Sequence, residues 1–214
     1  MKVICLTGYS GSGKSKATDL FVENLPNATV IKGSDFLRTS APHFPKEFEE
    51  IFEMPLDAIN PEDSLREGVN KSTRQHRAYM DVIASYMETQ IKNAMNDARN
   101  KGFNFLIIDW IELPKMDVWK TANYRIMVDA PDDIRTNRLL NRDGRSEKAK
   151  KFYSEKTSVI RRETFNEVLQ NAKPVDYLMY NGYNEHLLGE IQYLCQKIIK
   201  SHNLLAQHQN VGLT

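Results

Sequence analysis

Residues 8–15 have the composition and spacing of a loop that binds phosphate. They read GYSGSGKS, so Gly8, Gly13, Lys14 and Ser15 occupy every fixed position of the pattern GxxxxGK[ST]. Glycines allow backbone N–H groups to turn inward and approach phosphate oxygens that side chains would obstruct. Lys14 supplies a cation for the β and γ phosphates, and the Ser15 hydroxyl is suited to ligate Mg2+. The residues expected to bind the triphosphate of ATP are Gly8, Ser10, Gly11, Ser12, Gly13, Lys14 and Ser15.

A glycine-rich turn that only joins a strand to a helix is the alternative explanation of this loop. Such a turn would account for Gly8, but not for Lys14 and Ser15 in register at the start of a helix. The flanking sequence fits the functional explanation, because an apolar run at residues 3–7 precedes the loop and a helical pattern at residues 15–25 follows it. A strand, a glycine loop and a helix must occur in this order in a phosphate loop.

The remaining sequence alternates between apolar runs and helical patterns. Runs of strand length occur at residues 3–7, 28–32, 103–109, 124–129 and 177–180. Helical spacing occurs at residues 15–25, 72–100, 132 onward and about 185–201. Strands buried on both faces typically read as unbroken apolar runs, and alternation with helices is typical of parallel sheets. We expect an α/β fold, namely a P-loop NTPase three-layer sandwich with a parallel sheet of about five strands.

The chain is expected to form a single P-loop domain over residues 1–202. Prolines break up residues 36–70, which we interpret as an insertion on the substrate side of the sheet. A polar segment over about 138–165 is interpreted as a helical lid, and the weak periodicity of residues 203–214 predicts a flexible tail.

Two acidic residues follow predicted strands and are candidates for catalysis and metal binding. Asp35 lies just past the second strand, at the sheet edge where ligands bind in parallel α/β folds, so it is our candidate general base. It could instead cap a short helix. Asp109 ends the third strand and could orient the magnesium waters, with Glu112 and Asp129 as competing acids.

Basic residues recur along the predicted helix that starts near residue 132. Arg142 lies where this helix runs into Asp143-Gly144, so we expect it to belong to a lid that excludes water and offsets charge on the moving phosphoryl group. For Arg135 we favour a solvated helix face paired with neighbouring acids such as Asp132. The expected catalytic set is therefore Lys14, Asp35 and Arg142.

Composition and absent motifs narrow the class of protein. The chain has 29 Lys and Arg against 28 Asp and Glu, so its net charge of +1 gives no reason to expect nucleic acid or membrane partners. No apolar segment approaches the roughly 20 residues of a membrane span, and no secretory signal precedes residue 8, so we expect a cytoplasmic protein. A guanine-reading NKxD sequence is absent. These features favour a small-molecule kinase that uses ATP and Mg2+, of undetermined oligomeric state.

Several segments resemble the dephospho-coenzyme A kinase family. Residues 4–15 are similar to its "LTGGIGSGKS", residues 128–144 to its arginine-rich lid, and residues 176–182 with the following leucines to its closing element. The resemblance implies phosphate transfer to the ribose 3'-hydroxyl of dephospho-coenzyme A. It also implies that Asp35 is the second acid of an Asp-x-Asp motif that abstracts the hydroxyl proton, and that Arg142 is the lid arginine.

The sequence departs from this family around the acceptor. Gly33 stands where the family has the first acid of Asp-x-Asp, and residues 108–112 replace its "PLLfE" strand end. Uridine kinase is the next resemblance, through residues 10–15 and 35–37, and nucleoside monophosphate kinases share the same parts. A protein of another class, an ATP-binding regulator without acceptor turnover, is the remaining alternative.

Overall fold

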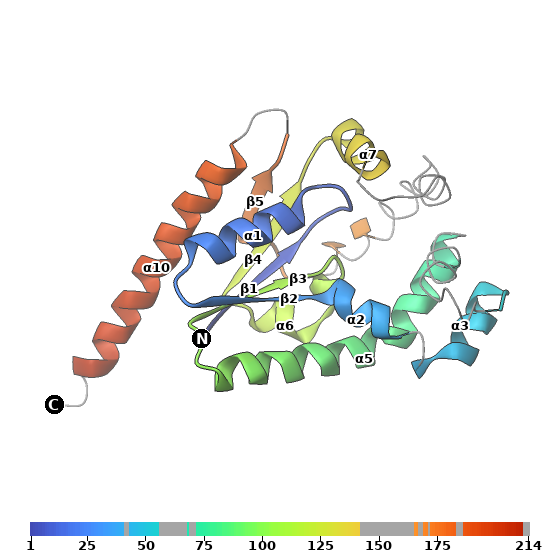
Figure 1. Ribbon diagram of the computed structural model, residues 1–214, viewed down its shortest axis with the longest axis horizontal. Helices are drawn as coiled ribbons and strands as arrows, with labels where there is room; N and C mark the ends of the chain where they lie inside the picture. The colour runs from blue at the N-terminus through green and yellow to red at the C-terminus, as the bar shows by residue number, and fades with distance from the viewer. Residues whose placement is uncertain are drawn as a thin grey trace.

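A parallel sheet of five strands forms the centre of the described structure (Figure 1). Its strands are β1 (Lys2–Thr7), β2 (Ala28–Lys32), β3 (Phe105–Asp109), β4 (Tyr124–Asp129) and β5 (Tyr177–Tyr180). They lie in the order β2-β3-β1-β4-β5, and every neighbouring pair is parallel. The predicted α/β fold with about five parallel strands is therefore confirmed.

The computed structural model describes residues 1–40, 43–55, 68, 72–141, 165–166, 169–170, 172–182 and 186–211. The helices are α1 (Lys14–Asn24), α2 (Gly33–Ser40), α3 (Pro45–Phe52), α5 (Thr73–Asn100), α6 (Asp117–Thr121), α7 (Asp132–Leu140) and α10 (Leu187–Val211), with a 3-10 turn, η2, at Leu113–Lys115. Arg142 and most of the predicted lid lie outside the described residues.

Helices cover both faces of the sheet, with α1 and α10 on one side and α5 and α6 on the other (Figure 1). Successive side chains of a strand point to opposite faces, so Ile4 and Leu6 of β1 pack with α1 and α10, whereas Val3 and Cys5 pack with α5 and α6. This double burial explains why the strands read as unbroken apolar runs.

All five strands end at the same edge of the sheet. β1 leads from Thr7 directly into residues 8–15, and Asp109 at the end of β3 lies in register with Leu6 of β1 and Lys32 of β2. The phosphate loop, Asp109 and the start of α2 are thereby brought to one edge, where ligands bind in open parallel sheets.

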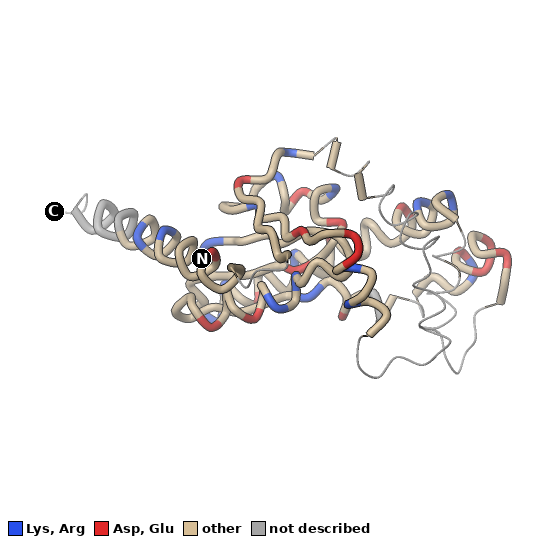
Figure 2. Tube along the Cα trace, turned by 90° about the horizontal axis from the view of Figure 1, so that it is seen from above, with Lys and Arg blue, Asp and Glu red and all other residues tan. Residues whose placement is uncertain are grey.

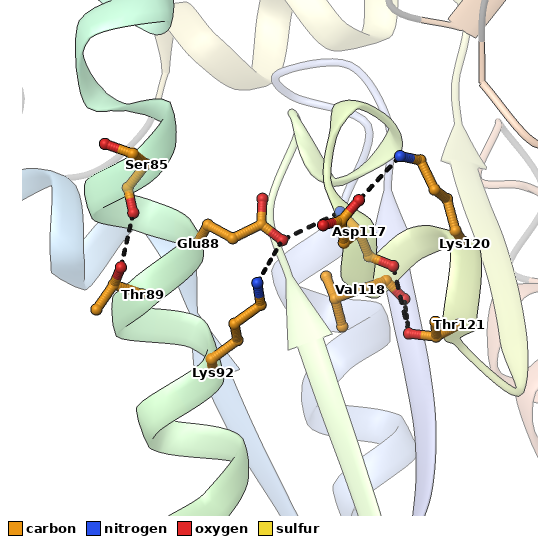
Figure 3. Close-up of polar contacts among 8 residues, drawn as sticks. All are labelled: Ser85, Glu88, Thr89, Lys92, Asp117, Val118, Lys120 and Thr121. Atoms are coloured by element: carbon orange, nitrogen blue, oxygen red, sulfur yellow. Dashed lines mark hydrogen bonds and ion pairs between the residues drawn. The ribbon is translucent and has the colours of Figure 1, made fainter.

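Polar contacts join α5 to the short helix α6 (Figure 3). The N–H of Asp117, the first residue of α6, donates to Oε1 of Glu88 on α5 over 3.2 Å. Lys92 lies 3.6 Å from the same carboxylate, and Lys120 Nζ lies 2.9 Å from Oδ1 of Asp117. A carboxylate at a helix N-terminus satisfies a donor that has no partner within the helix, so Glu88 fixes the start of α6 against α5.

Two segments are more helical than the sequence analysis predicted. Helix α10 continues to Val211, although a tail was expected from residue 203, because no proline or glycine interrupts the chain between Gly189 and Gly212. Helix α2 covers residues 33–40, so it includes the first residues of the segment 36–70 that was interpreted as an insertion broken up by prolines. Within the same segment, residues Pro45–Phe52 form helix α3.

Basic and acidic residues are interspersed along the described chain (Figure 2). Among the described residues, no helix combines the length and hydrophobicity needed to cross a membrane.

Candidate functional site

Two glycines of the phosphate loop adopt backbone conformations that side chains would prevent. Gly8 has φ +143°, and a Cβ atom there would lie 2.0 Å from the carbonyl oxygen of Val128. Gly13 has φ +96°, and a Cβ atom there would lie 2.0 Å from Nδ2 of Asn181. The fixed glycines of the pattern are thus required both by the turn and by close packing against the strand ends.

The carbonyl groups of the loop are held on its outer side. Nη1 of Arg138, on α7, lies 3.4 Å from the Gly11 oxygen and 3.3 Å from the Ser12 oxygen. The amide Nδ2 of Asn181, which follows β5, donates to the same Ser12 oxygen over 2.9 Å. We call Arg138 and Asn181 the clamp on the phosphate loop. In a trans peptide the C=O and the N–H of the next residue point in opposite directions, so the Gly13 N–H is directed away from this clamp. It precedes the first turn of α1, and the N-terminus of a helix suits an anion.

Arg138 and Asn181 were not among the predicted site residues. Arg138 also lies 3.3 Å from the Asn181 carbonyl oxygen, so the two side chains form one cluster, and Asn181 is buried. The only sequence signals were that Arg138 belongs to an arginine-rich helix and that Asn181 belongs to the resembling segment 176–182. Neither signal places a residue beside Ser12, because the contact depends on how α7 and β5 pack around the loop.

Lys14 folds back over the phosphate loop. Its Nζ donates to the carbonyl oxygens of Gly8 and Tyr9 over 2.7 and 3.1 Å. The ammonium group therefore lies at the mouth of the loop, where it could exchange these carbonyls for phosphate oxygens. This position fits the role predicted for Lys14.

Asp109 lies at the end of β3 against the first turns of α1. Its Oδ2 lies 3.2 Å from the hydroxyl of Thr18, and the carboxylate is buried. Burial raises the pKa of Asp109 above its ordinary value, while the nearby Lys14 ammonium and the Thr18 hydrogen bond act in the opposite direction. Ser15 precedes Thr18 by three residues, so both hydroxyl-bearing residues occupy one face of α1.

The oxygen groups of Ser15 and Asp109 suit Mg2+, a hard cation that commonly keeps waters and binds few protein carboxylates together with substrate phosphates. The described residues contain no group of three or more His, Cys, Asp or Glu side chains arranged to hold a metal. A metal shared with phosphates does not need such a group.

The two competing acids are engaged elsewhere. Glu112 is buried, with Oε1 3.7 Å from Nε2 of His76 and Oε2 3.3 Å from Nζ of Lys115. Oδ1 of Asp129 accepts a hydrogen bond from the N–H of the next residue, Ala130, over 2.8 Å. Asp109 differs from both because its carboxylate contacts the helix that follows the phosphate loop.

Asp35 is exposed in the first turn of α2. The helix begins at Gly33, so Asp35 lies within the helix and does not cap it. β2 ends at Lys32, in register with Asp109, so Asp35 belongs to the same sheet edge as the phosphate loop. This placement agrees with the predicted role of Asp35 as a base, which remains a prediction.

The predicted solvated position of Arg135 is wrong. The expected pairing with Asp132 is present, but Arg135 is buried and its guanidinium lies 4.2 Å from the ring centre of Tyr9. The Tyr9 hydroxyl donates to Oδ1 of Asn166, and its ring packs edge-on against Phe165. Helical spacing alone could not show that this face of α7 meets the phosphate loop.

Comparison with known proteins gives similarity at the level of the fold. No family model matches the chain, and no curated protein matches it. TT1252 from Thermus thermophilus is a similar solved structure, with a TM-score of 0.61 at 16% identity over 93% of this chain and 97% of that one. Dephospho-CoA kinase from Campylobacter jejuni gives a TM-score of 0.47 at 14% identity, over 94% of this chain and 97% of that one.

A shikimate kinase from Bacteroides thetaiotaomicron gives a TM-score of 0.45 at 13% identity, over 93% of this chain and 98% of that one. The match with TT1252 supports the α/β fold, in which this chain has a five-stranded parallel sheet of order β2-β3-β1-β4-β5.

Proposed function

We propose that this protein is an ATP-dependent small-molecule kinase. The observation that carries the proposal is the geometry of the phosphate loop, in which Arg138 and Asn181 hold carbonyls of the loop on its outer side, next to the N-terminal end of α1. Lys14 lies over the same loop. Such a loop binds a nucleoside triphosphate.

In this proposal the residues of the loop bind ATP, the phosphate donor. Acidic residues at the sheet edge assist transfer of the phosphoryl group. Lys14 leaves the Gly8 and Tyr9 carbonyls and pairs with the β and γ phosphates. Ser15 and Asp109 would hold Mg2+, which when bound neutralises charge on the phosphates. Asp35 accepts the proton of the attacking hydroxyl. Arg142, outside the described residues, is proposed to offset the charge that develops on the phosphoryl group.

The acceptor that we propose is the ribose 3'-hydroxyl of dephospho-coenzyme A. Support comes from the sequence resemblance in three segments, including the one that contains Asn181. The alternatives are uridine, cytidine or nucleoside monophosphates as acceptors. An ATP-binding regulator without acceptor turnover is the alternative of a different class.

The test is ADP formation from ATP and Mg2+ with each acceptor in turn. We expect turnover with dephospho-coenzyme A above the rate without acceptor. We expect loss of turnover in Lys14→Met, which keeps an unbranched side chain of nearly the same length and removes the charge. Turnover with uridine, cytidine or a monophosphate instead would keep the kinase proposal and reject the acceptor. Tight ATP binding with no turnover on any acceptor would reject the kinase proposal in favour of the regulator.

A further inference from the structure

Thr18 is a buried hydroxyl residue that reaches two acceptors. Its side chain is fully buried, and Oγ1 lies 2.9 Å from the carbonyl oxygen of Lys14 and 3.2 Å from Oδ2 of Asp109. A hydroxyl carries one proton, so it divides this donor between a helix carbonyl and a carboxylate. A charged acceptor makes the stronger hydrogen bond, which favours Asp109.

The ordinary explanation of Thr18 accounts for only one of these contacts. A threonine within a helix commonly donates to the carbonyl four residues earlier, as Thr18 does to Lys14. That hydrogen bond within the helix does not explain the contact with the carboxylate of Asp109, which lies 91 residues away in sequence. The contact with Asp109 arises because β3 ends beside the second turn of α1.

The position of Thr18 links the two groups proposed to hold Mg2+. Thr18 lies one helical turn after Ser15 on the same face of α1, and it contacts Asp109 directly. Among the residues that the structure describes, Asp109 Oδ2 receives this bond from Thr18 and Oδ1 receives none. One carboxylate oxygen is thus held by the protein through Thr18.

We propose that Thr18 is a positioning residue that orients the Asp109 carboxylate toward Mg2+–ATP. The inference rests on the proposed function, because it assigns Ser15 and Asp109 to the metal. The hydroxyl fixes Oδ2, so that Oδ1 accepts a hydrogen bond from a metal-bound water or contacts the ion. Residues of this kind typically change metal affinity by roughly 10- to 100-fold when they are removed.

The experiment compares Thr18→Val, which keeps the shape and removes the hydroxyl, with Thr18→Ser, which keeps the hydroxyl. ATP affinity is measured by calorimetry in EDTA and over a series of Mg2+ concentrations, without any acceptor. We expect Thr18→Val to raise the Mg2+ concentration for half-maximal enhancement of ATP binding by about 10-fold or more. ATP affinity in EDTA should stay within about 2-fold, and Thr18→Ser should behave as the wild type.

A second pair of variants separates orientation of Asp109 from a general loss of structure. Asp109→Asn should reproduce the Mg2+-specific defect, and Thr18→Val combined with Asp109→Asn should add little to it, because both act through one carboxylate. Thr18→Ala serves in the same test if Thr18→Val does not fold. An unchanged Mg2+ dependence, or an equal loss of affinity in EDTA, would overturn the role of Thr18 alone. A wild type that bound ATP equally with and without Mg2+ would overturn both this role and the proposed metal site.

Discussion

Gly33 at the start of α2 lies directly under the indole of Trp110, the residue that follows Asp109. A Cβ atom at position 33 would lie 2.4 Å from Cγ of Trp110 and 2.7 Å from its Cβ. Both residues belong to segments that depart from the dephospho-coenzyme A kinase pattern. The two departures are therefore one packing arrangement, since a side chain at position 33 and this indole position exclude each other.

We expect Gly33→Ala to lower the free energy of unfolding by about 1–3 kcal/mol, because an extra atom in a packed site forces side chains or backbone to move. The measurement is urea unfolding. Gly189→Ala is the matched control, since Gly189 also lies in a helix but has no atom within 4 Å of its built Cβ. That variant should be neutral or stabilising by up to about 1 kcal/mol. Combining Gly33→Ala with Trp110→Leu should recover part of the loss, and strictly additive effects would contradict the packing argument.

The clamp on the phosphate loop predicts a specific effect on ATP binding. Asn181→Ala removes the 2.9 Å hydrogen bond to the Ser12 carbonyl and one partner of Arg138. A buried hydrogen bond of this kind is worth about 1–1.5 kcal/mol, so we expect ATP affinity to fall by roughly 5- to 10-fold. Asn141→Ala is the control, because Asn141 is exposed at the end of α7. Equal ATP affinity in the two variants would show that the clamp does not order the loop.

Asp35→Asn tests the proposed base while preserving the size of the side chain. General-base assistance contributes about 10²- to 10⁴-fold, so turnover should fall by at least two orders of magnitude. ATP affinity should remain within about 2-fold, since Asp35 is assigned to the acceptor. Asp81→Asn, on the exposed side of α5, provides the control. Full activity in Asp35→Asn would show that Asp35 is not the general base and that another residue accepts the proton.

The features of the fold and the site that could be predicted are those formed by consecutive residues of the sequence. The strands at 28–32, 124–129 and 177–180 were predicted with the observed bounds, because each is a short run rich in apolar, β-branched and aromatic residues that is recognisable from its own sequence. The phosphate loop was predicted for a related reason, since its glycines, lysine and serine are contiguous.

The contacts around the loop depend on tertiary packing and could not be foreseen. Arg138 and Asn181 lie more than 120 residues from Ser12 in sequence, and only the arrangement β1-β4-β5 brings them together. The position of Arg135 was predicted wrongly, because helical periodicity gives the relative positions of side chains on α7 but does not show which face of the helix contacts Tyr9. The same limit applies to Gly33, because the Trp110 side chain that occupies the space beside it comes from a distant segment of the chain.

The two cysteines provide a test of the core that is independent of activity. Burial raises the pKa of Cys5 and of Cys195 to about 12, far above the roughly 8.5 of an exposed thiol. The thiolate is the reactive form, so the native protein at pH 8 should react only slowly with a disulfide reagent such as DTNB. In urea both thiols should react rapidly, and this sample is the internal control.

The same shift makes stability depend on pH in the alkaline range. The folded state keeps both thiols protonated, whereas the unfolded state loses these protons above about pH 8.5, so stability is fully present below that pH and declines between it and about pH 12. Each thiol should lower the free energy of unfolding by up to about 1.4 kcal/mol per pH unit in this window. Cys195→Ala should reduce the slope of urea-derived stability against pH from pH 9 to 10. A fast-reacting thiol in the native protein would show that at least one of the two cysteines is accessible. An unchanged slope in this variant would show that the packing of α10 against the sheet leaves Cys195 accessible.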